Sequence, residues 1–175
     1  MSPPGAPLTP AEVAGLLEAA MSSLRAELGA LPDRVVTGHP AAGEWCAKEV
    51  VGHLIEAERR GFAGRIRIIL ASNAPALQNW NQTEIAQARK DCERPMGALL
   101  DELAALRRES IALVRGLGAA DLGRGGQHPK VGLLRVGDLL QEWVHHDRNH
   151  LRQALANVQA YVWPSMGNSQ KFSAE

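Results

Sequence analysis

The chain has 175 residues, which is long enough for one well-packed domain and short for two. Its 19 lysines and arginines balance 19 aspartates and glutamates, and proteins that bind nucleic acids normally show a basic excess, so we expect no nucleic-acid partner. No apolar run reaches 18 residues and the N-terminus lacks the features of a signal peptide, so we expect no membrane partner and a cytoplasmic location.

The first two helices are predicted in the N-terminal half. Residues 10–28 carry apolar side chains at three- and four-residue steps, with Thr9 as N-cap, Pro10 at the first helical position and Glu12 three residues after the cap. A loop at 38–43 leads into a second helix over about 47–71, which has one broad apolar stripe. Residues 72–89 are expected to form a less regular connection that contains Trp80.

Two more helices are predicted in the C-terminal half, over about 95–117 and 136–158, with a glycine-rich loop between them. No segment gives a convincing strand. The chain is therefore predicted to be all-α, a four-helix bundle with long inter-helix connections that leave room for a crossover. We expect a single domain over 1–163 and a polar C-terminal tail over 164–175.

Three histidines form the main candidate site. His146 and His150 lie one turn apart, roughly 6 Å in axial rise, on one flank of the fourth helix's apolar face, whereas His145 falls on the opposite side. His53 lies at the edge of the apolar stripe of the second helix, and a bundle can bring residues from such helices together around a metal. The alternative is that these are half-buried histidines with local hydrogen bonds. The pair lacks the glutamate of the HExxH motif, so protease chemistry of that type is not supported.

Three neutral imidazoles suit Zn, Ni, Fe or Cu. We expect Zn or Ni first, with Fe or Mn as further candidates. Glu142 precedes His146 by one turn and Glu49 precedes His53 by one turn, so either glutamate is a candidate catalytic base or could orient a ring. The alternative for both is a solvated helix face.

Charged residues also fall where apolar ones are expected. Glu58 and Arg65 project near the centre of the second helix's stripe and Asp147 near that of the fourth, and buried charges need partners. The hypothesis is a Glu58–Arg65 or an Asp147–Arg65 pair.

The cysteines and the other histidines of the chain are not expected to form a site. Cys46 and Cys92 lie outside any zinc-knuckle or CxxC spacing and are expected to be ordinary reduced thiols. His39 and His128 each precede a proline in a loop and are expected to be surface or loop-packing residues.

Two stretches resemble the DinB/YfiT-like superfamily. The first is Gly43-Glu44-Trp45 leading into residues 48–54. The second runs from His128-Pro129 through Gly132, residues 136–140 and Trp143 to residues 145–153. The resemblance implies a four-helix bundle with a divalent metal held by His53, His146 and His150. It also implies that the protein could be a homodimer, as members often are.

Some members of that superfamily are transferases that use low-molecular-weight thiols, including bacillithiol transferases and mycothiol-dependent maleylpyruvate isomerases. The leading hypothesis is accordingly a metal-dependent thiol S-transferase, with a low-molecular-weight thiol as second cofactor and a small-molecule substrate. The alternatives are a metal-dependent hydrolase that activates water at the same site, and a non-catalytic, metal-stabilised bundle for stress response or binding.

Overall fold

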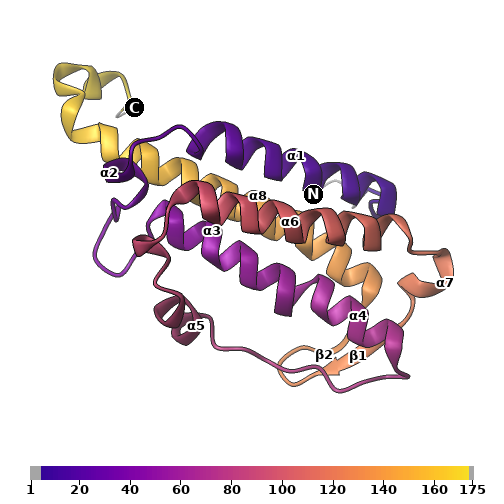
Figure 1. The fold of residues 1–175 in the computed structure, drawn as a ribbon. Coiled ribbons are helices and arrows are strands. Elements are labelled where there is room, and N and C mark those ends of the chain that lie inside the picture. Colours follow the sequence, from indigo (N-terminus) through magenta and orange to yellow (C-terminus); the bar gives the residue numbers. More distant parts are fainter. Residues whose placement is uncertain (1–4, 174–175) are drawn as a thin grey trace.

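The structure is a computed structural model and describes residues 5–173. Four long helical segments run alongside one another (Figure 1). They are α1 (Pro10–Leu28), α3 continued by α4 (Ala47–Glu56 and Ala63–Ala71), α6 (Met96–Arg115) and α8 (Val136–Val162). Between them lie the short helices α2 (Asp33–Val36), α5 (Gln82–Arg89) and α7 (Ala119–Leu122), and the strands β1 (Gly125–His128) and β2 (Gly132–Arg135). The predicted four-helix bundle is confirmed.

The order of the helices around the bundle differs from their order in the chain. Helix α1 packs against α6 and α8, and α3 packs against the same two helices. Helices α1 and α3 are thus diagonal neighbours, although they follow each other along the chain apart from the short α2. The connection over residues 29–46 therefore crosses the bundle.

Helix α1 begins where its capping residues predict. The Thr9 hydroxyl accepts a hydrogen bond from the Glu12 backbone N–H at 3.3 Å, and Glu12 Oε2 accepts one from the Thr9 N–H at 2.8 Å. This capping box satisfies two N–H groups that have no partner within the helix. Pro10 takes the first helical position, where its lack of an N–H costs nothing.

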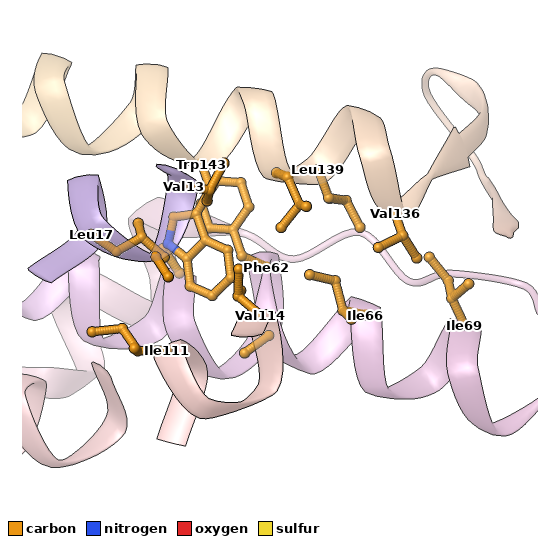
Figure 2. Close-up of a cluster of buried hydrophobic side chains, with 14 of the residues drawn as sticks. Val13, Leu17, Phe62, Ile66, Ile69, Ile111, Val114, Val136, Leu139 and Trp143 are labelled. Carbon is orange, nitrogen blue, oxygen red and sulfur yellow. The ribbon is translucent and has the colours of Figure 1, made fainter. Parts of the chain in front are cut away.

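The bundle core contains two apolar clusters. One lies around the stacked rings of Phe62 and Trp143, whose centroids are 5.0 Å apart (Figure 2). The other gathers residues of α1, α3 and α6 with Ala154 of α8. Its fully buried members include Leu28, Val50, Val51, Ile55, Leu99, Leu100 and Leu103. Along α8, Trp143 belongs to the first cluster and Ala154 to the second, so His146 and His150 fall between them.

A π-helical turn, Ala57–Gly61, separates α3 from α4. The Phe62 N–H donates to the Ala57 carbonyl at 2.8 Å, an i→i+5 bond that accommodates one residue more than an α-helical turn. A Cβ at Gly64 would lie 1.9 Å from the Arg59 carbonyl oxygen, so glycine is required there. The predicted second helix thus spans the right residues but consists of two segments with different rotational registers.

The buried charges pair differently from the prediction. Glu58 and Asp147 both bind Arg107 of α6, at 2.8 and 2.5 Å, and the Ser110 hydroxyl also contacts Glu58. The predicted pairing with Arg65 is wrong, because the extra residue of the π turn rotates Arg65 away from Glu58. Arg65 instead donates to the Gln78 carbonyl at 3.3 Å.

The expectation of no strand is also wrong. Strands β1 and β2 form an antiparallel hairpin in which Gly125 faces Arg135 and His128 faces Gly132. A parallel bridge from Ala76 to Gln127 ties the hairpin to the connection after α4. The strands are four residues each and rich in glycine, a residue depleted in strands, so they resemble a loop in sequence.

The remaining segments are short. The connection expected to be irregular contains α5, capped by the Asn81 side chain. After α8 the chain forms two 3₁₀ turns, Trp163–Ser165 and Gly167–Phe172. Residues 1–4 and 174–175, at the ends of the predicted domain and tail, lie outside the described residues. None of the described helices is both long and apolar enough to span a membrane.

Candidate metal centre

Three imidazoles from two helices converge at one point in the bundle. His53 comes from α3, and His146 and His150 come from successive turns of α8. Each offers a ring nitrogen that lies within 4.8 Å of the other two, and the Nε2 atoms of His53 and His146 are 3.0 Å apart. Bonds of about 2.05 Å to a tetrahedral zinc ion would place nitrogen ligands about 3.3 Å apart, so the spacing fits such an ion.

The triad is held in its neutral form by burial. The side chain of His53 is only 5% exposed. Desolvation, followed by the charge of His150, lowers the pKa of His53 to about 3. Desolvation and the two neighbouring imidazoles lower the pKa of His146 to about 2, and desolvation also lowers that of His150. At neutral pH all three rings therefore offer lone pairs, the form in which histidine binds metals.

Hydrogen bonding selects the nitrogen that His150 presents. Its Nδ1 lies 2.8 Å from Gln153 Oε1, a group that can only accept, so Nδ1 carries the proton and Nε2 the lone pair. Ligand histidines in metal sites are commonly oriented in this way. His146 Nδ1 is buried and has no hydrogen-bond partner among the described residues. The Nε2 atoms of His53 and His146 face each other at a distance that allows both to bind one cation.

Aromatic rings enclose the triad. Trp45 lies 4.9 Å from the His53 ring and 6.3 Å from that of His150, and Trp80 stacks on His53 at 5.7 Å. Phe62 meets His146 edge-on at 5.1 Å. The Trp45 backbone is fixed in turn, because the Asn157 side chain donates to its carbonyl at 2.7 Å. These rings restrict access of water to the three nitrogens.

A cavity of about 400 Å³ adjoins Trp80 on the surface of the bundle. Three arginines line it: Arg59, Arg60 and Arg65. Arg59 and Arg60 both pair with Glu56, whereas Arg65 forms no ion pair with any described residue and donates to a carbonyl and to His128. Trp80 stacks on His53 and also lines the cavity, so its ring lies between the cavity and the triad.

The family model described as the DinB superfamily matches residues 4–154. The chain belongs to the DinB superfamily. In this DinB protein, the histidines that the superfamily resemblance singled out are the three that the fold brings together.

Individual relatives of this DinB protein carry related descriptions. Two curated proteins named "Putative metal-dependent hydrolase" are similar to it. The one from Oceanobacillus iheyensis is 24% identical over 70% of each chain, and the one from Halalkalibacterium halodurans is 23% identical over 74% of this chain and 75% of its own. YfiT from Bacillus subtilis, described as a probable metal-dependent hydrolase with an unusual four-helix bundle topology, superposes with a TM-score of 0.81. It is 19% identical, and the match covers 92% of this chain and 94% of YfiT, which shows the shared fold.

The other residues considered from the sequence lie outside the triad. His145 is exposed and contacts Asn149 at 3.3 Å, as its place on the far side of the helix predicts. Glu142 is exposed, and its charge acts on Arg65 at the cavity. Glu49 accepts a hydrogen bond from the Cys46 backbone N–H at 2.8 Å. The catalytic roles of both glutamates stay predictions.

Sequence reasoning missed two residues of the site, Trp80 and Gln153. Trp80 belongs to a segment with no helical pattern, and only the tertiary fold places it on His53. Gln153 lies three residues after His150, and this i,i+3 spacing on a helix was a signal that could have identified it.

Proposed function

We propose that His53, His146 and His150 hold a divalent metal ion and that the protein is a metal-dependent hydrolase of a small molecule. The convergence of three neutral imidazole nitrogens carries this proposal. A divalent ion with three imidazole ligands and an open position supplies a water of lowered pKa, a nucleophile at neutral pH. Zn or Ni is the preferred ion, and Fe or Mn come next. The relatives' names support a divalent metal and hydrolysis.

Residues around the triad have definable tasks in this proposal. Gln153 holds the His150 ring with its Nε2 lone pair toward the ion. Trp45 and Trp80 exclude bulk water, and Arg65 at the adjoining cavity binds an anionic group of the substrate. Of the two candidate bases, Glu142 is the better placed, since Glu49 already caps the first turn of α3.

A second candidate function, thiol S-transfer, is favoured by the same arginine-lined cavity. Some low-molecular-weight thiols, such as glutathione, carry carboxylates, and the guanidinium of Arg65 is suited to bind one. In this reaction the thiol loses its proton to a base such as Glu142. The sulfur then forms a bond to an electrophilic carbon, and the leaving group departs with its electron pair. The third hypothesis is a non-catalytic bundle, in which the metal only stabilises the fold.

The test begins with metal analysis of the purified full-length protein. His53→Gln, His146→Gln and His150→Gln should each lower metal occupancy, and His145→Gln, on the same helix but exposed, should not. The metal-loaded protein is then assayed with esters and amides, and separately with an electrophile plus bacillithiol, mycothiol, glutathione or coenzyme A.

The outcomes of these assays distinguish the three proposed functions. Metal-dependent cleavage of an ester or amide without thiol would support the hydrolase. Metal-dependent consumption of a thiol would instead support the S-transferase. Inactivity in both assays, with metal only raising the melting temperature, would overturn both enzymatic proposals. Equal loss of metal from His145→Gln would overturn the ligand assignment. The expectation of a homodimer is tested separately by the molar mass in solution.

A further inference from the structure

A second group of metal-ligand side chains lies at the start of α3. His39, Cys46, Glu49 and Cys92 each offer one donor atom, and the four atoms lie within 4.8 Å of one another. The Sγ atoms of Cys46 and Cys92 are 2.8 Å apart, and Cys92 Sγ is 3.9 Å from His39 Nε2. This group could not be recognised from the sequence, because the two cysteines are 46 positions apart and no zinc motif has that spacing.

The histidine of this group is oriented as a metal ligand. His39 Nδ1 lies 2.7 Å from the Glu44 carbonyl oxygen, which can only accept, so Nδ1 carries the proton. The Nε2 lone pair then faces Cys92 Sγ. A backbone carbonyl on one ring nitrogen and a metal on the other is a recurring arrangement in metalloproteins. The side chain of His39 is 47% exposed, which gives an ion a route from solvent.

We propose that His39, Cys46, Glu49 and Cys92 form a second metal site that binds Zn²⁺. Two sulfurs, one imidazole nitrogen and one carboxylate oxygen make a complete tetrahedral set, and thiolates with imidazole favour zinc over hard cations such as Mg²⁺. Binding converts both thiols to thiolates, and their two protons pass to solvent. With all four positions filled by protein, the site has a structural role, unlike the open triad.

The carboxylate of Glu49 gives this group a negative charge, which attracts a cation. Burial raises the pKa of the Cys46 thiol, and the nearby Glu49 carboxylate adds to the effect on both cysteines. Two thiols and a carboxylate thus face one another, and the charge of Lys48 also acts on Cys92. The Lys48 ammonium group pairs with Asp33 at 2.5 Å and lies 3.3 Å from the Cys92 carbonyl oxygen. A divalent ion would stabilise the thiolates that burial disfavours.

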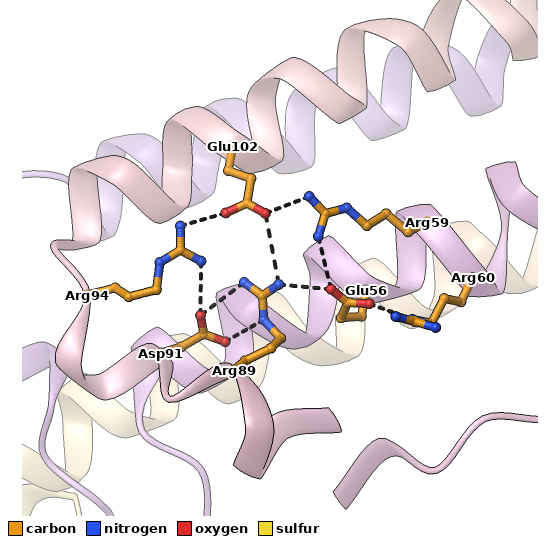
Figure 3. Close-up of polar contacts among 7 residues, drawn as sticks. All are labelled: Glu56, Arg59, Arg60, Arg89, Asp91, Arg94 and Glu102. Carbon is orange, nitrogen blue, oxygen red and sulfur yellow. Dashed lines mark hydrogen bonds and ion pairs between the residues drawn. The ribbon is translucent and has the colours of Figure 1, made fainter. Parts of the chain in front are cut away.

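The residue before Cys92 belongs to a network of ion pairs (Figure 3). This residue, Asp91, is buried and binds Arg89 at 2.7 Å and Arg94 at 3.2 Å. Arg89 continues to Glu56 of α3 at 2.8 Å, and Arg94 to Glu102 of α6 at 2.6 Å. The turn that carries Cys92 is therefore fixed to two bundle helices, and zinc binding requires the two sulfurs to move from 2.8 Å to about 3.8 Å apart.

The proposed zinc site adjoins the triad through Trp45. Cys46 directly follows this tryptophan, and the seven residues from Cys46 to His53 correspond to about 10 Å along the helix. An ion at the second site would tie the loop of His39 to the turn of Cys92. It would thereby hold Trp45 against His53 and His150.

The competing state is a disulfide between Cys46 and Cys92. It would use only two of the four donors. It also requires an oxidant such as a peroxide to accept two electrons, whereas zinc binding changes no oxidation state. The four-donor geometry therefore favours the ion.

The test uses Co²⁺ as the probe with full-length protein that has been reduced and freed of metal. A thiolate-to-Co²⁺ charge-transfer band should appear with the intensity of one cysteine-bound ion per chain and disappear on addition of Zn²⁺. The band should persist in His146→Gln, because the triad contains no sulfur, so its outcome is independent of the proposed hydrolase. Cys46→Ser and Cys92→Ser should each lose it. Serine remains a good N-cap at position 46, and circular dichroism checks the fold.

His39→Gln serves as the milder variant. It should weaken zinc binding by at least the roughly 100-fold that loss of an outer-shell partner can cost. His145→Gln, which removes an exposed histidine outside both sites, is the matched control and should bind as the wild type does. The proposal is overturned if the reduced protein gives no thiolate band, or if Cys92→Ser keeps it. A protein purified as the Cys46–Cys92 disulfide and unable to take up zinc after reduction would also overturn it.

Discussion

Arg107 is a buried cation between two carboxylates, and its replacement by methionine should destabilise the protein strongly. Its side chain is 2% exposed, and it binds Glu58 at 2.8 Å and Asp147 at 2.5 Å, both of them buried as well. Removal of one partner from a buried ion pair costs about 3–5 kcal/mol because the other charge is left uncompensated. That is a large part of the roughly 5–15 kcal/mol that stabilises a typical domain.

The destabilisation should depend on pH with a definite sign. Burial already raises the pKa of Glu58, and without Arg107 a carboxylate of this pair should be protonated more readily still. The folded variant then binds more protons than its unfolded chain, so its stability rises as pH falls. For one proton the deficit relative to the wild type should shrink by up to about 1.4 kcal/mol per pH unit between pH 7.5 and 5.5.

The assay is urea unfolding followed by circular dichroism at both pH values. Arg108→Met, an exposed arginine of the same helix, is the matched control and should change the free energy of unfolding by no more than about 0.5 kcal/mol. Adding Glu58→Gln to Arg107→Met should recover part of the loss. Equal effects of the two arginine variants, or a deficit that grows as pH falls, would refute this account of the buried charges.

Three further predictions concern packing and the triad. Gly52→Ala places a Cβ 1.8 Å from a carboxylate oxygen of Asp91 and should lower the free energy of unfolding in urea by about 1–3 kcal/mol. The control Gly15→Ala, where a Cβ meets no atom, should raise it by about 0.5–1 kcal/mol. Gln153→Leu removes the acceptor that orients the third imidazole, and competition with a chelator should show metal affinity reduced by about 10–100-fold with little change in melting temperature. Burial lowers the pKa of His53 to about 3 and that of His146 to about 2, so both rings are already neutral at pH 6. Metal binding at pH 6 by a variant without cysteines should therefore release less than about one proton. Three ordinary imidazoles would release about two. Calorimetry in buffers of different ionisation enthalpy measures that release, and a value near two would contradict the neutral triad.

Much of the bundle could be predicted because its helices carry regular signals. The Thr9–Glu12 capping box and the three- and four-residue apolar steps specify α1 from local chemistry alone. The hairpin over residues 125–135 carries no such signal. Its pairing depends on the close approach of Pro75 and Leu77 to Gly126, where a Cβ would lie 2.7 Å from the Pro75 carbonyl oxygen. A contact of this kind requires glycine, but the sequence does not show which distant segment the glycine contacts.

The same distinction applies to the two candidate sites. His146 and His150 could be paired from sequence because helix geometry puts residues four apart on one face. The addition of His53 needed the bundle geometry and the superfamily resemblance together. Cys46 and Cys92 could not be paired, since an ion-pair network and a bundle crossover bring their segments together and neither leaves a periodic pattern.

The π turn explains both the wrong ion pair and the shape of the triad's surroundings. In an unbroken α-helix at 100° per residue, the nine residues from His53 to Phe62 would place the two side chains about 180° apart. One residue accommodated in the π turn reduces this to about 80°, which lets Phe62 reach His146 and stack on Trp143. The broad apolar stripe of the second helix is therefore two narrower stripes in different registers. Glu58 and Arg65 seemed to share a face only because the sequence pattern does not reveal the inserted residue. The π turn, which the sequence pattern does not reveal, thus lets one helical segment supply both the His53 imidazole and the Phe62 ring that packs on His146.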